Sequence, residues 1–81
     1  MMTRDWLLKI AKAVEDWPTM PKDDVAVAMS VSTPAGAVAY IVSHRIPTEE
    51  RAAVRAALPT LTTNNFAAAA QQIREVAEAL G

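Results

Sequence analysis

Cysteine is absent from this 81-residue sequence and glycine is scarce, and both shortages exclude chemistry. Without cysteine, the chain has no disulfide framework, no thiolate nucleophile and no sulfur ligand for a metal. Its two glycines, Gly36 and Gly81, cannot form the glycine-rich loop that cradles phosphates in nucleotide-binding proteins. We therefore expect none of the common nucleotide-binding motifs, and the composition fits a reducing compartment.

Strong net charge and long apolar runs are also missing. Eight basic and nine acidic residues leave a net charge of −1, which provides no general field for attracting nucleic acid or anionic lipid. No apolar run approaches the roughly 20 residues of a membrane span, and charges interrupt the N-terminal stretch "MMTRDWLLKIAKAVEDW", unlike a signal peptide. We expect a soluble cytoplasmic protein in which residues 1–81 form one small domain.

Catalytic groups are few. The only histidine, His44, follows Ser43, but neighbouring residues of a strand point to opposite faces and would not meet as a base and a nucleophile. The acidic pairs at 23–24 and 49–50 are explained as turn, strand-entry and helix-start residues, and a single histidine with scattered acids does not suggest a metal site. We expect no catalytic residues, no cofactor and no bound metal.

Three segments have the apolar spacing of amphipathic helices. The first begins near Thr3, a plausible N-cap, and ends before Pro18; the second begins at Thr48 and ends at Pro59. The third covers "NFAAAAQQIREVAEALG". The residues expected to face the core are Trp6, Ile10, Ala13, Val14 and Trp17 in the first, Ala53, Val54, Ala57 and Leu58 in the second, and Phe66, Ala69, Ala70, Ile73, Val76, Ala77 and Leu80 in the third.

The stretch "VAVAMSVSTPAGAVAYIVSH", residues 25–44, predicts an antiparallel β-hairpin. Its turn would be the segment "TPAG", in which Pro34 presets the first central residue and Gly36 accepts a left-handed conformation. With helices before and after the hairpin, the predicted fold is α+β in the order helix, strand, strand, helix, helix.

The two faces of this hairpin would differ in composition. The face assigned to the core carries Val25, Val27, Met29, Val31, Ala39 and Ile41. The other face carries small or mixed residues, and we expect self-association through Ser30, Ser32, Val38, Tyr40, Val42 and His44. Because helices cover only one face of a two-stranded ribbon, a homodimer with paired sheets is the favoured hypothesis. Cover by the C-terminal helix, or by a different protein, stays open.

Three arginines form a candidate partner-binding patch. Arg51 and Arg55 stand four residues apart in the second predicted helix without an acidic i+4 partner, and Arg51 lies near the positive end of the helix dipole. Arg45 enters the connector before that helix. Together they could bind an acidic protein surface or a phosphate, while a solvated face balanced by acidic residues is the simpler alternative.

Three classes of function follow from these features. The first is a small non-catalytic protein-binding module, an adaptor or an inhibitor of the kind that viruses and mobile elements encode, acting through the sheet face or the arginine-bearing helix. The second is a nucleic-acid-associated regulator that uses Arg45, Arg51 and Arg55. A small enzyme ranks last. The third predicted helix carries one basic residue, Arg74, against Glu75 and Glu78, which argues against a DNA-recognition helix.

Overall fold

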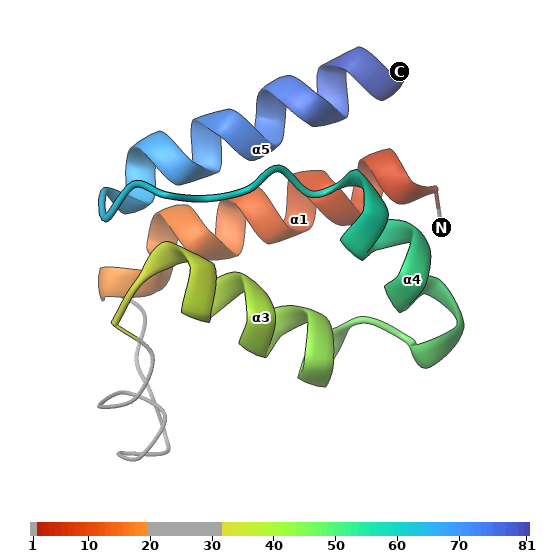
Figure 1. Ribbon diagram of the computed structural model, residues 1–81, viewed down its shortest axis with the longest axis horizontal. Helices are drawn as coiled ribbons and strands as arrows, with labels where there is room; N and C mark the ends of the chain where they lie inside the picture. Colours follow the sequence, from red (N-terminus) through yellow and green to blue (C-terminus); the bar gives the residue numbers. More distant parts are fainter. Residues whose placement is uncertain (1, 20–31) are drawn as a thin grey trace.

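The computed structural model describes residues 2–19 and 32–81, and this part of the chain is helical, with no strand. Its elements are α1 (Thr3–Asp16), the 3-10 helix η1 (Trp17–Thr19), α3 (Pro34–Arg45), α4 (Thr48–Ala57) and α5 (Phe66–Leu80). Helices α1 and α5 run antiparallel beside each other, while α3 and α4 meet at a corner on the other side of α1 (Figure 1). The described chain is therefore an all-α four-helix domain.

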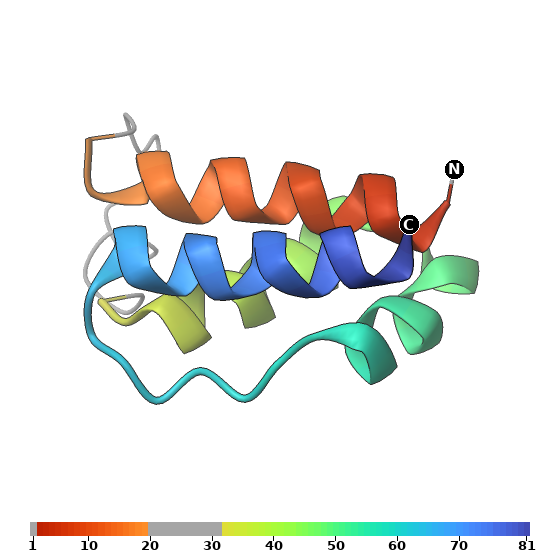
Figure 2. The same ribbon diagram turned by 90° about the horizontal axis from the view of Figure 1, so that it is seen from above.

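Helices α1 and α5 form the centre of the core. They lie side by side in both views, with the start of α1 next to the end of α5 (Figure 2). Buried alanines stand on both helices, and side chains this small allow helices to pack closely. The fully buried residues are Leu7, Ile10, Ala11 and Val14 on α1, and Ala69, Ala70, Ile73 and Ala77 on α5.

The amphipathic pattern placed these two helices correctly but erred at their margins. Trp6 and Ala13, expected in the core, are half-buried, and Leu7 takes the central position instead. Leu80 is 53% exposed, because it lies in the last turn of α5. Thr3 is not the N-cap of α1: that position falls to Met2, whose side chain makes no capping bond.

The predicted β-hairpin, and with it the α+β fold, is wrong, because residues 34–45 form helix α3. Thr33 is the N-cap, and its hydroxyl accepts a hydrogen bond from the Gly36 N–H at 3.1 Å. Pro34 occupies the first helical turn, where its missing N–H costs nothing and its fixed φ suits the helix. The segment "TPAG" is thus a helix start, and Gly36 has no positive φ.

The spacing of buried residues in α3 has the helical period that a strand interpretation overlooks. Pro34, Ala37, Val38, Ile41 and Val42 are buried, at intervals of three and four residues. Ala39, expected on a core face, is exposed. The register proposed for residues 38–44 therefore does not exist, and the expected first strand, with Val25, Val27, Met29, Val31 and Ser30, lies outside the described residues.

Helix α4 and the segment after it match their predicted positions. Pro47, rather than Thr48, is the N-cap of α4, and Pro59 follows Leu58, which has extended backbone angles. Of the predicted core residues of α4, Val54 is buried while Ala53 is exposed. Residues 58–65 then cross the domain in an extended path to the start of α5 (Figures 1 and 2), where the Asn65 side chain caps the helix by accepting from the Ala68 N–H at 3.0 Å.

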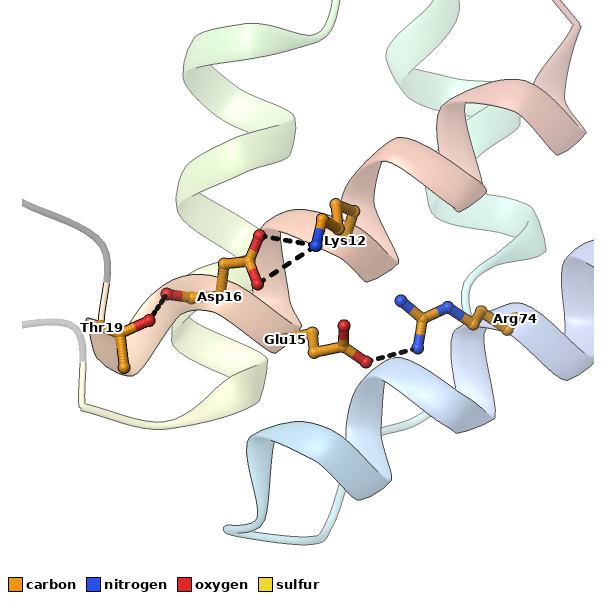
Figure 3. A network of polar contacts seen from close by, with 5 residues as sticks. All are labelled: Lys12, Glu15, Asp16, Thr19 and Arg74. Atoms are coloured by element: carbon orange, nitrogen blue, oxygen red, sulfur yellow. Dashed lines mark hydrogen bonds and ion pairs between the residues drawn. The ribbon is translucent and has the colours of Figure 1, made fainter.

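A polar contact on the surface joins α1 to α5. The Arg74 guanidinium donates to Glu15 at 2.7 Å, and this hydrogen bond and the cationic charge lower the pKa of the Glu15 carboxyl (Figure 3). On α1 itself, Lys12 pairs with Asp16 at 3.2 Å. Within the described ranges, no helix is both long enough and apolar enough to cross a membrane.

Candidate functional site

A groove of about 280 Å³ opens between α3, the end of α4 and the connector that follows it. The residues that line it are Ala35, Val38, Ala39 and Val42 from α3, Arg55 from α4, and Leu58, Pro59 and Leu61 from the connector. Seven of these eight residues are apolar, and Arg55 is the charged one. A groove of this composition can hold apolar side chains beside one anionic group.

Burial varies across the groove. Val38 and Val42, 8% and 2% exposed, form its deepest part and also belong to the core of the domain. Leu58, Pro59 and Leu61 are half-buried along the connector. Ala35 and Ala39 are exposed on α3, so the groove is open to solvent at its edge.

Local sequence explains why a groove forms here. Ala35 and Ala39 stand one helical turn apart, and their single methyl groups leave the space above Val38 and Val42 unfilled. On the opposite side, Pro59 disfavours helical geometry at Leu58, so the chain leaves α4 in an extended path beside α3.

Arg55 is the polar feature of the groove. It lies in the last turn of α4, where the helix dipole favours a cation, and it is exposed. Within the part of the chain that the structure describes, it makes no hydrogen bond or ion pair. Its guanidinium is therefore available to a carboxylate or phosphate from outside the domain.

The other two arginines of the predicted patch have different surroundings. The Arg51 Nε–H donates to the carbonyl of Ile46 at 2.9 Å, at the end of α3. The helix dipole disfavours a cation in the first turn of α4. The Arg51 guanidinium offsets this cost by satisfying a carbonyl at the end of α3. Arg45 is exposed in the last turn of α3. Arg45 and Arg51 thus mark the α3–α4 corner, and only Arg55 of the three lines the groove.

The six residues predicted to mediate self-association do not share one face. Val38 and Val42 are buried in this chain's own core, Ser32 is exposed before α3, and Ser30 lies outside the described residues. Tyr40 is half-buried, with its ring 5.9 Å from that of Trp17, and it stacks on His44 at 4.2 Å. The sheet face that would have grouped these residues is absent from residues 38–44.

His44 has a structural contact. Its Nδ1–H donates to the carbonyl of Tyr40 at 3.0 Å, one turn earlier in α3. Ser43 is exposed on the same helix. Within residues 2–19 and 32–81, no three histidine or acidic side chains converge as metal ligands.

Five of the eight lining residues were not predicted as site residues: Ala35, Ala39, Leu58, Pro59 and Leu61. Nothing in the sequence of residues 34–42 distinguished the exposed Ala35 and Ala39 from the buried residues around them, because every residue from Ala35 to Val42 is apolar, aromatic or glycine. Pro59 marked the end of α4, but the sequence did not indicate that residues 58–61 lie beside α3, because that placement depends on tertiary packing. Comparisons of the chain with protein-family models, with curated proteins and with solved structures find no match.

Proposed function

We propose that this protein is a small non-catalytic protein-binding module that acts through the groove between α3 and the segment 55–61. The observation that supports this proposal most directly is an apolar groove open to solvent, lined in part by Arg55, which has no ion-pair partner among residues 2–19 and 32–81. Adaptors and inhibitors bind through such features, since apolar side chains supply affinity and one charge orients the partner.

A groove-filling substitution tests the proposal. Ala39→Phe places a ring in the groove from an exposed position, whereas Ala67→Phe adds the same ring at an exposed position of α5 outside the groove. Each variant, and the unchanged chain, would capture proteins from a lysate of the source cells for quantitative mass spectrometry. Proteins retained by the unchanged chain and by Ala67→Phe, but lost from Ala39→Phe, are the expected result. Equal capture by all three would refute the groove as the binding site.

The alternative of a nucleic-acid-associated regulator has weaker support. It needs Arg45, Arg51 and Arg55 to act together, but Arg51 is engaged with the Ile46 carbonyl. Glu49 and Glu50 in the first turn of α4 would also repel phosphate. Salt-dependent binding to generic DNA that is lost on Arg45→Ala and Arg55→Ala would favour this alternative instead.

Homodimer formation is a separate proposal, and the argument from the sheet face no longer supports it. Val38 and Val42, which were to be covered by a second subunit, are covered by this chain itself. Light scattering over a hundredfold dilution measures the mass directly, and a mass of one chain throughout would rule out a stable dimer.

A further inference from the structure

The geometry points to a specific kind of partner for this groove: a polypeptide segment that inserts one or two large apolar side chains between α3 and the connector and pairs an adjacent Asp or Glu with Arg55. This inference rests on the proposed function and adds the chemistry of the partner. It is carried by the groove and by the charge placed at its edge.

The apolar part of the inference follows from the lining. The floor formed by Val38 and Val42 and the wall formed by Leu58 and Leu61 offer no hydrogen-bonding side chain. A polar side chain placed there would lose its contacts with water without replacement, whereas an aliphatic or aromatic side chain would not. The occupant of the deepest part of the groove is therefore apolar.

The acidic part follows from charge complementarity. Arg55 is the charged lining residue and has no ion-pair partner in the described chain. Two other cations of the described chain are engaged with acidic side chains, since Arg74 pairs with Glu15 and Lys12 with Asp16. A guanidinium donates through a planar fork that matches a carboxylate, so an acidic side chain next to the apolar anchor would make a directed contact.

The size and openness of the groove favour a polypeptide over a small ligand. About 280 Å³ is at or below the small end of sites that enclose drug-sized molecules, which are roughly 300–1,000 Å³. Because Ala35 and Ala39 are exposed, the groove would surround one face of a side chain while the rest of the segment lay outside. This is how a peptide anchors in a surface groove.

The test selects peptides from a phage-displayed library of random twelve-residue sequences. Selections run in parallel on the unchanged chain, on Arg55→Glu and on Arg45→Glu, which makes the same charge change at an exposed arginine outside the groove lining. Circular dichroism verifies that each variant is folded. We expect the unchanged chain and Arg45→Glu to enrich Leu, Ile, Phe or Trp next to Asp or Glu, and Arg55→Glu to enrich the same apolar residues next to Lys or Arg.

The most enriched peptide is then synthesised, and its binding is measured by fluorescence anisotropy. Arg55→Glu should weaken binding about tenfold or more, because an attractive charge pair becomes repulsive, and added salt should reduce the difference. Ala39→Phe should abolish binding and Ala67→Phe should not.

The other outcomes separate the two proposals. Peptides without acidic residues that bind equally to Arg55→Glu, but are lost on Ala39→Phe, would overturn the acidic partner and leave the groove as the binding site. Failure to enrich any peptide, or binding unaffected by Ala39→Phe, would overturn both. A dimer in solution that Ala39→Phe dissociates would show that a second copy occupies the groove and would also overturn the acidic partner.

Discussion

The α1–α5 pair and helix α3 are built from equally simple sequences, yet only the pair could be recognised as helical from its sequence pattern. Helices α1 and α5 each have one apolar face and pack against each other, and Ile10, Val14 and Ile73 on those faces are fully buried in the core. Helix α3 is apolar on nearly every side, from Ala35 to Val42. A helix without a polar face has no distinctive period, so its sequence resembled a strand.

This difference also separates stability from recognition. Where both helices of a pair are amphipathic, packing them together covers the apolar face of each helix. Where a helix is apolar all around, one side enters the core and another side remains uncovered. In α3, Ile41 is buried while Ala35 and Ala39 remain exposed beside the groove. The apolar character of α3 on nearly every side therefore both concealed its helical structure in the sequence and produced the candidate site.

The largest expected effect comes from a charge placed inside α3. Val42→Asp buries an unpaired carboxylate at a position that is 2% exposed, and we expect a loss of more than about 4 kcal/mol in the free energy of unfolding. Because a domain of this size has roughly 4–12 kcal/mol in total, most of the chain should lose its helical circular dichroism signal.

Ser43→Asp is the matched control, since Ser43 is the neighbouring exposed residue of α3. It should remain folded. The predicted hairpin placed Val42 on a face for self-association. A Val42→Asp chain that stays folded but self-associates differently would therefore contradict the burial of this side chain.

The next effect tests the α1–α5 side of the comparison. Leu7→Ala removes a fully buried side chain and leaves a cavity, so urea denaturation should show a loss of about 2–5 kcal/mol. Leu80→Ala, at a residue that is 53% exposed, should change stability by less than about 0.5 kcal/mol. Similar losses for the two substitutions would show that Leu80 is buried in the core, as the apolar pattern of α5 predicted.

A smaller effect concerns the start of α3. Thr33→Ala removes the hydroxyl that accepts from the Gly36 N–H, and we expect a loss of about 1 kcal/mol in thermal or urea unfolding. Thr33→Ser keeps the hydroxyl and should retain most of that stability. If both substitutions were neutral, Thr33 would not act as a helix cap.

The smallest effect is the pH dependence of the Glu15–Arg74 contact. Its hydrogen bond lowers the pKa of Glu15 in the folded chain, so the stabilisation is fully present above the unfolded pKa, about 4.3, and is lost as pH falls through the folded value. The melting temperature of the unchanged chain should slightly exceed that of Glu15→Gln at pH 7. The difference should disappear at pH values below the folded pKa.

Arg74→Ala is the control for this titration. In that background, the difference in melting temperature that Glu15→Gln makes should depend much less on pH, because the main partner that lowers the pKa of Glu15 is gone and only the weaker effect of Lys12 remains. A persistent pH-dependent difference would assign the stabilisation to another neighbour of Glu15.

The candidate site was predictable only in part. Arg55 was recognised because a cation without an acidic i+4 partner is informative in a helix. Val38 and Val42 were identified as contact residues, but on a sheet face rather than in a helix that buries them. The cap at Thr33 and the proline after it were visible in the sequence, yet the same residues also fit a turn.

By itself the sequence determined the helices whose period was unambiguous, the proline-marked end of α4, and the absence of thiol chemistry, because these depend on local geometry and composition. The tertiary structure decided that residues 34–45 are helical and that an extended connector lies beside them. Both outcomes depend on contacts between segments far apart in the chain, since a uniformly apolar stretch adopts whichever backbone its neighbours allow it to pack in. The groove follows from that packing, and Arg55 faces it for the same reason.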